Sequence, residues 1–344
     1  VAQLQAWLVR NELWLAFLLL LWPLLQFRQE FERRLDFDEM FTFHISAINS
    51  FGDMLRAVPA DGNPPLYYLL AHGSQQLLGM TDFAVRLPAI VGFCVAWLAI
   101  YAFVRRRAGA FAALFALFVF DNAPLASYAF NARPYTVMLA FTLVALLCWQ
   151  RATERESGRF LPLTGIAIAT AGAIASHHFG AFHVGIPLML GEAWRLLRTR
   201  RMDWPVYAAG LIGASMLLLT VPLMQGTNSA LLTYTKATAD FVGRPRLRDL
   251  TAYRDMSDPW LLVAVAIVLT LELTRSRQRT RPDVDTCFAS HEIVAAVGLA
   301  AMVPIILATT ALTTEYFASR YAIGSAAGIA ILAGVAASYA VRGT

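Results

Sequence analysis

Long apolar runs, separated by short polar segments, recur along the whole chain. Eleven stand out, at residues 13–27, 64–79, 86–104, 108–123, 134–150, 161–176, 180–197, 205–224, 258–274, 293–312 and 321–340. A run of about 20 apolar residues matches the hydrocarbon thickness of a bilayer, and a helix satisfies its own backbone polar groups there. Of the 344 residues 58% are hydrophobic and 15% charged, whereas about a quarter are charged in soluble domains. The pattern therefore predicts an all-α membrane protein.

The charge pattern gives these helices an orientation. Arginine gathers in four segments between the runs, which are Arg105–Arg107; Arg151, Arg155 and Arg159; Arg195, Arg198, Arg200 and Arg201; and Arg275, Arg277, Arg279 and Arg281. Each segment follows every second run, so all four share one side of the membrane, and the positive-inside pattern makes that side cytoplasmic. The net charge of +5 therefore reflects topology, and it indicates contact with membrane lipids and not with nucleic acid.

The run at 64–79 does not fit this alternation as a spanning helix. If it crossed the membrane, the acidic segment before it would lie on the arginine side. If it does not cross, residues 28–84 form one outer loop with four arginines against eight acidic residues. His72, Gln75 and Gln76 also give this short run a polar stripe. We therefore predict an interfacial helix on the outer leaflet.

A second amphipathic segment, at 38–52, lies in the same loop. Polar residues at Asp38, Thr42 and Ser46 recur at helical spacing beside the apolar Phe41 and Ile45, as on a surface helix. The predicted architecture is a single domain over residues 1–344 with about ten transmembrane helices. Two interfacial helices (38–52 and 64–79) lie in the first outer loop, a second outer loop covers 225–257, and both ends of the chain are cytoplasmic.

The strongest candidate chemistry is the acidic motif just after the first apolar run. Asp36, Asp38 and Glu39 lie within four residues, and neighbouring carboxylates at a membrane surface can act as a general base or bind a cation. Asp36 and Asp38 also spell D-x-D, a metal-binding pattern. The alternative is structural, because Asp36 and Glu39 have the spacing of a capping box at a helix start.

Arginines and histidines recur at the outer ends of the predicted helices. Such arginines can bind a phosphate by a forked contact, or can simply anchor a helix at the interface. Adjacent histidines without a third ligand indicate hydrogen bonding better than a metal site. The candidates are Arg86, Arg133 before Pro134-Tyr135, Arg320 before Tyr321, His177 and His178, with Asn63, His72, Arg244 and Arg246 as further candidate substrate contacts.

Several of these pieces together resemble a known family. They are Phe37-Asp38-Glu39, Asn63-Pro64-Pro65-Leu66-Tyr67-Tyr68, Val85-Arg86-Leu87-Pro88 after Gly79, Ala132-Arg133-Pro134-Tyr135, His177-His178-Phe179 and Arg320-Tyr321. Their order and spacing are similar to those of the GT-C glycosyltransferases. The nearest branch contains protein O-mannosyltransferases, lipid A aminoarabinose transferases and rhizobial core glycosyltransferases. Asn63 departs from the pattern, because relatives often have a basic residue there.

The resemblance implies a GT-C fold and a polyprenyl-phosphate sugar as donor. It implies transfer to an envelope lipid, glycan or protein hydroxyl outside the bacterial cytoplasmic membrane. On these motifs Asp38 and Glu39 are the catalytic residues, with Asp38 as the base and Glu39 as its neighbour, and Arg133, Tyr135, Arg320 and Tyr321 bind the donor phosphate. We expect an inverting reaction without a metal or other cofactor, with a divalent ion at Asp36 and Asp38 as the alternative.

Two other classes of function fit an all-α membrane protein. A transporter or flippase of lipid-linked sugars would place ionisable residues in mid-membrane and show paired repeats or broken helices. The charges of this chain gather instead at the ends of the apolar runs. A scaffold protein without catalysis would not need Asp38 and Arg133 on one face. We therefore favour the glycosyltransferase.

Overall fold

The computed structural model describes residues 2–155, 157–223, 244–259, 261, 263, 288–313 and 316–342. All regular secondary structure in these residues is helical, which confirms the predicted class. The longer helices are α1 (Ala2–Gln26), α6 (Asp82–Asp121), α7 (Tyr135–Thr153), α8 (Phe160–Ser176), α9 (Gly180–Thr199), α10 (Trp204–Ala214), α14 (Ser290–Ala300), α15 (Met302–Leu312) and α16 (Gly324–Arg342). The shorter ones are α2 (Arg28–Glu32), α3 (Phe37–Ser46), α4 (Phe51–Ala57), η1 (Val58–Ala60), α5 (Leu66–Leu78), η2 (Pro124–Phe130), η3 (Leu247–Ala252), α12 (Tyr253–Met256) and η4 (Ser319–Ala322).

Helix α6 consists of two helical segments, and the chain reverses direction between them at Gly109. The backbone there has φ 81° and ψ −178°, a region that glycine enters without steric penalty. The indole N–H of Trp97 donates to Asp121 Oδ2 at 3.2 Å across 24 residues, which a straight helix would separate by about 36 Å. The apolar runs at 86–104 and 108–123 are therefore two helices joined by a tight turn.

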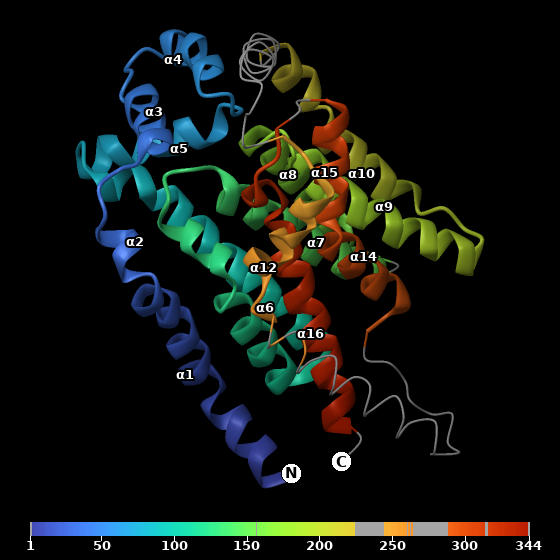
Figure 1. Ribbon diagram of the computed structural model, residues 1–344. Helices are drawn as coiled ribbons and strands as arrows, with labels where there is room; N and C mark the ends of the chain where they lie inside the picture. The colour runs from blue at the N-terminus through green and yellow to red at the C-terminus, as the bar shows by residue number, and fades with distance from the viewer. Residues whose placement is uncertain are drawn as a thin grey trace.

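Ion pairs join the loops at one end of the bundle. They are Arg106 with Glu154 after α7, Arg107 with Glu292 in α14 at 2.6 Å, and Arg159 with Asp203 before α10 at 2.7 Å. Helix α1 begins and α16 ends at the same end (Figure 1). Three of the four arginine segments thus share one end of the molecule, as their spacing predicted, and the fourth, at 275–281, lies outside the described residues.

Helices α3, α4 and α5 gather at the opposite end (Figure 1). The helix predicted at 38–52 is two helices, because α3 ends at Ser46 and Ser50 starts α4 by accepting the N–H of Asp53 at 3.3 Å. The helix predicted at 64–79 is present as α5 and stops at Gly79, which has φ 81°. That residues 28–84 lie outside the membrane stays a prediction.

The polar stripe of α5 contacts α3. His72 Nδ1 lies 2.8 Å from the carbonyl oxygen of Ser46, and the Gln75 amide donates to Phe43 O at 3.4 Å. Both carbonyls lie in the last turn of α3, where the Phe43 carbonyl also accepts from the N–H of Ala47 and from the hydroxyl of Ser46. The polar side chains of the predicted interfacial helix therefore hold two short helices together.

Four helices in the described part of the chain are long and apolar enough to cross a membrane. They are Trp7–Gln26, Asp82–Asp121 (the two helices that meet at Gly109, counted as one), Tyr135–Thr153 and Trp204–Leu223. The pair α14 and α15, bent by 49°, would make a fifth span, and α8 and residues Gly324–Tyr339 are apolar but shorter. The run at 258–274 lies almost wholly outside the described residues, so the count of about ten spans stays a prediction.

Close packing of α6 on α7 sets the position of the residues before α7. A Cβ at Gly92 would lie 2.8 Å from the backbone nitrogen of Val137, so the two helices meet backbone to backbone. The Thr136 hydroxyl donates to Ala89 O at 2.8 Å across the same contact. The start of α7, with the arginine motif before it, is therefore fixed against α6.

Candidate active site

The acidic motif begins α3 with a capping box. The Asp36 carboxylate accepts the N–H of Glu39 at 2.8 Å, and the Glu39 carboxylate accepts the N–H of Asp36 at 3.0 Å. Each acid thus satisfies an otherwise free N–H at the helix start, which confirms the structural alternative for these two residues. Asp38, between them, has a side chain that is 44% exposed.

Glu39 is fully buried, and protein donors surround its carboxylate. Arg86 donates from Nε at 2.8 Å and from Nη2 at 3.0 Å, the Ala132 N–H donates at 2.7 Å, and Arg33 also pairs with it. Burial acts to raise the pKa of Glu39, but these donors outweigh it and hold the pKa below its ordinary value of 4.5. With no exposed surface, Glu39 anchors α3 to α6 and to the start of α7, and the geometry favours this over the predicted catalytic role. Arg86, a candidate substrate contact, is part of the same anchor.

Asp38 meets Arg320 from the far end of the chain. Arg320 Nη2 lies 3.4 Å from Asp38 Oδ2, and Arg320 Nε donates to the Tyr135 hydroxyl at 3.0 Å. The guanidinium carbon also lies 6.0 Å from the ring centre of Tyr135 and 5.7 Å from that of Tyr321. The arginine is thereby held against two rings, beside an accessible carboxylate.

Arg133 approaches the same residue through its backbone. Its Nη1 donates to the backbone carbonyl of Asp38 at 3.0 Å and pairs with both oxygens of Asp61, at 2.8 and 2.6 Å. The Arg133 side chain is 8% exposed, and its buried Nε has no hydrogen-bond partner among the residues that the structure describes. The two arginines predicted to bind phosphate therefore both border Asp38, although Asp61 already balances the charge of Arg133.

The paired histidines pack against the aromatic side of this site. His177 is buried against the rings of Tyr135 and Tyr321, with centroids 5.3 and 5.6 Å away. Burial, followed by repulsion from His178 and other nearby cations, holds the pKa of His177 well below its ordinary value. His177 is therefore neutral near pH 7. His178 Nε2 bonds the carbonyl of Gly62, so the pair makes hydrogen-bonding and ring contacts.

The remaining candidate contacts are dispersed. Asn63 is buried at the turn before α5, and His72 bonds α3 as described above. Arg246 is exposed at the start of η3, where its N–H donates to Asp249 at 2.7 Å. Arg244 precedes it, and most of the loop predicted at 225–257 lies outside the described residues. Substrate contacts by Arg244 and Arg246 stay a prediction.

Comparison with known proteins identifies the fold. The family model for dolichyl-phosphate-mannose-protein mannosyltransferases matches residues 62–223. Two crystal structures of ArnT from Cupriavidus metallidurans, bound to undecaprenyl phosphate and in the apo state, superpose with TM-scores of 0.59 and 0.60 at 18% identity. The alignments cover 96% and 97% of this chain. This is the GT-C fold.

The GT-C fold that the sequence resemblance implied is thus confirmed. The chain spans 60% of the length of each ArnT chain. No curated protein matches the sequence. The matching family model begins after Asp38 and ends before Arg320.

Asp61 is a residue of this candidate site that the motifs did not include. Its side chain is 6% exposed and accepts from Arg133 and, at 2.6 Å, from the hydroxyl of Tyr68. It lies two residues before the Asn63-Pro64-Pro65 motif, which is the signal that could have drawn attention to it. Its contact with Arg133 makes Asp61 part of the candidate site.

The metal alternative depends on the surroundings of Asp36 and Asp38. In the part of the chain that the structure describes, no three His, Cys, Asp or Glu side chains lie close enough to hold a metal ion. Asp36 already accepts from Glu39 N–H and the Asn131 amide, and it pairs with Arg33 at 3.4 Å. Whether transfer uses a metal stays a matter for experiment.

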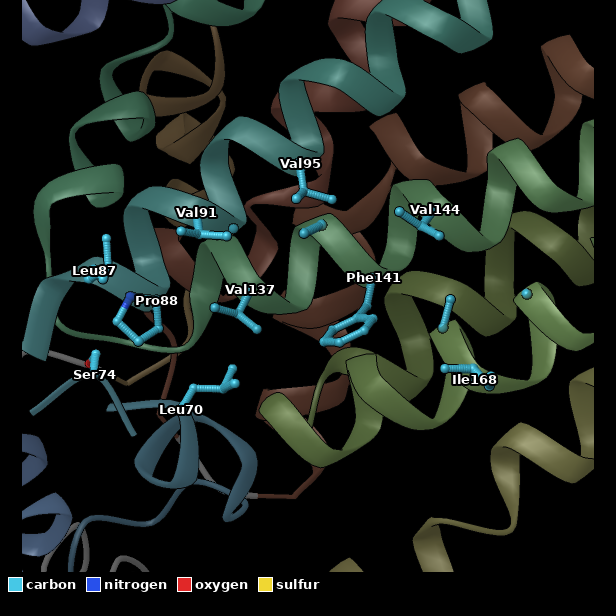
Figure 2. Close-up of a pocket in the computed structure, with 14 residues that line it drawn as sticks. Leu70, Ser74, Leu87, Pro88, Val91, Val95, Val137, Phe141, Val144 and Ile168 are labelled. Atoms are coloured by element: carbon cyan, nitrogen blue, oxygen red, sulfur yellow. The ribbon is translucent and has the colours of Figure 1, made fainter. Parts of the chain in front are cut away.

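An apolar groove of about 450 Å³ lies beside α5 (Figure 2). Its lining comes from α5, α6, α7 and α8 and includes Leu70, Val91, Val137, Phe141 and Ile168. Ser74 also borders it, but its hydroxyl donates to carbonyls of the protein. The groove therefore suits a hydrocarbon chain and offers a sugar no hydrogen bonds.

Proposed function

We propose that this protein is a GT-C glycosyltransferase that moves a hexose or pentose from a polyprenyl-phosphate donor to an acceptor hydroxyl. The acceptor belongs to an envelope lipid, a glycan or a protein. Transfer takes place at the outer face of the bacterial cytoplasmic membrane, at the end of the bundle opposite the arginine segments. The family match, the GT-C fold and the apolar groove support a lipid-linked substrate.

The observation that carries the proposal is the pairing of Asp38 with Arg320. A carboxylate that is 44% exposed lies 3.4 Å from a guanidinium that is 26% exposed. A base for the acceptor and a cation for the leaving phosphate are thus side by side and both accessible. Glu39 and Asp61, by contrast, are enclosed by protein.

The reaction follows from these positions. The acceptor hydroxyl gives its proton to Asp38, and its oxygen forms a bond to the anomeric carbon of the donor sugar. The bond from that carbon to the phosphate oxygen breaks on the opposite face, so the configuration inverts and the electron pair leaves with the polyprenyl phosphate. Arg320 stabilises the charge that develops there, and Arg133 is the second arginine that the motifs assign to the phosphate. A general base of this kind contributes about 10²–10⁴-fold in rate.

Asp38→Asn tests the proposal directly. The assay supplies the purified protein with radiolabelled undecaprenyl-phosphate hexoses and pentoses, and with membranes from a strain that lacks the gene as acceptor. Asn preserves the shape of Asp38 but cannot take a proton, so we expect transfer to fall by at least about 10²-fold. Membrane insertion and thermal stability should stay near those of the wild type.

Asp36→Asn is the matched control, because Asn is also a good helix N-cap. We expect it to keep most of the activity. An active Asp38→Asn protein would remove the base assignment. Equal losses in both variants, together with stimulation by added divalent metal, would instead favour the D-x-D metal site.

A further inference from the structure

Asp61 connects the turn before α5 to the candidate active site. Both of its carboxylate oxygens lie within 2.8 Å of Arg133 Nη1, and the Tyr68 hydroxyl donates to Oδ2 at 2.6 Å. The Asp61 side chain is 6% exposed and that of Tyr68 is buried. Asp61 therefore has protein partners on each side and little surface for a substrate.

The pair with Arg133 extends to the first turn of α3. The same Nη1 that pairs with Asp61 donates to the backbone carbonyl of Asp38 at 3.0 Å. A buried guanidinium needs a counter-charge to remain in place, and Asp61 supplies it. The position of Asp61 thus fixes the guanidinium, and the guanidinium fixes the backbone of Asp38.

Glu39 restrains the adjoining residue of the same turn. Its carboxylate is bound by Arg86 and by the N–H of Ala132, so residues 38 and 39 are each tied to a different element. Between these two anchors the Asp38 carboxylate points to Arg320, 3.4 Å away. Loss of one anchor would leave the turn free to shift.

We propose that Asp61 is a positioning residue for sugar transfer, acting through Arg133 to hold Asp38 in line with Arg320. The inference rests on the proposed function of the site. Asp61 itself touches neither the donor nor the acceptor. A displacement of about 1 Å in a reacting group can lower a rate by about 10²-fold, so the role should appear in kcat more than in KM.

The experiment lengthens the side chain while keeping its charge. Asp61→Glu, Arg133→Gln and the double variant are compared with the wild type for kcat, donor KM and thermal stability, using the undecaprenyl-phosphate sugar that the wild type transfers. Asp53→Glu is the matched control. Asp53 lies in the same loop and also pairs with an arginine, but that pair is exposed.

We expect Asp61→Glu to lower kcat by about tenfold or more, with donor KM within about threefold of the wild type. Stability should be kept, because the counter-charge for Arg133 remains. If Asp61 acts through Arg133, the double variant is no slower than Arg133→Gln alone. Asp53→Glu should match the wild type throughout.

Other outcomes contradict the inference without touching the proposed function. A wild-type kcat in Asp61→Glu would show that charge balance alone is needed, and an unfolded Asp61→Glu protein would show a role in the fold itself. An equal further loss in the Arg133→Gln background would show that Asp61 acts independently of Arg133. A wild-type protein that transfers sugar from no undecaprenyl-phosphate donor would count against the proposed function instead.

Discussion

Arg320 holds its position through ring contacts and hydrogen bonds together. Tyr135 and Tyr321 lie against it, Tyr135 accepts from Nε, and Asp38 faces Nη2. Arg320→Ala should therefore raise the donor KM and lower kcat, with little loss of stability. Arg320→Lys should recover part of the activity, because an ammonium keeps the charge but loses the planar fork. Steady-state kinetics with varied donor measures both effects, and normal turnover in the Ala variant would exclude a phosphate-binding role.

Glu39 should make the stability of the protein depend on acidity. Its pKa in the folded protein is below the ordinary 4.5, so the stabilisation is fully present above pH 4.5 and is lost as the pH falls through the lower folded value. The melting temperature in detergent should therefore fall on acidification below pH 4.5. Glu39→Gln should melt lower at pH 7, since removing one charge of a buried pair costs about 3–5 kcal/mol. The difference in melting temperature between the wild type and Glu39→Gln should become smaller toward pH 3. A constant difference would contradict the lowered pKa of Glu39.

The sequence predicted some residue contacts of this site and not others. The capping box of Asp36 and Glu39 could be found because its two members are three residues apart and obey a local rule. The pair of Arg133 with Asp61 spans 72 residues, and its formation depends on how α5 and α7 each pack against α6. The motifs indicated that Arg133 and Arg320 lie at one end of the molecule. They gave no information on which side chains pair with these two arginines.

Packing at the level of helices gives a sharp test at Gly92. A Cβ there would lie 2.8–2.9 Å from three backbone atoms of Thr136 and Val137, and backbone cannot rotate away as a side chain does. Gly92→Ala should therefore separate α6 from α7 and destabilise the protein by about 1–3 kcal/mol. Activity should fall with it, because α7 follows directly on Arg133. Gly73→Ala on α5 is the control, since no atom lies within 4 Å of the place that its new methyl group would take, and an equal melting temperature in both variants would contradict the close approach.

Periodicity predicted the presence of these helices more reliably than it predicted the residues at which they end or the helices that they contact. The stripe over residues 38–52 is real, but Ser50 caps a new helix after Ser46, and local capping chemistry interrupts a pattern that hydrophobicity alone continues. A polar stripe such as that of His72 and Gln75 is typical of an interfacial helix, whose polar side faces water. This stripe contacts the carbonyl end of α3 instead, and a single sequence cannot distinguish water from another helix end as the hydrogen-bonding partner.

The arrangement of the whole molecule followed from counting charges. The parity of the arginine segments predicted that they share one end, and the ion pairs of Arg106, Arg159 and Arg195 place three of them there. The same count put the acidic motif and the later arginines at the other end, where Asp38, Arg133 and Arg320 meet. The charge count predicts which loops share an end of the molecule because it uses many residues over long segments. The identity of the sugar and the acceptor depends instead on a few side-chain contacts, about which the charge count gives no information.

The orientation in the membrane has a direct test. If residues 28–84 lie outside and α5 does not cross, single cysteines at positions 57 and 82 must both react with a membrane-impermeant maleimide added to intact spheroplasts. A cysteine at position 155, near the arginine segments, should react only after lysis. The native Cys94, Cys148 and Cys287 are first replaced by serine to remove background labelling.

Labelling of positions 57 and 82 from opposite sides would mean that α5 spans the bilayer. The acidic first turn of α3 would then lie across the membrane from Arg320, which the 3.4 Å contact with Asp38 does not permit, so that result would overturn both the topology and the proposed site.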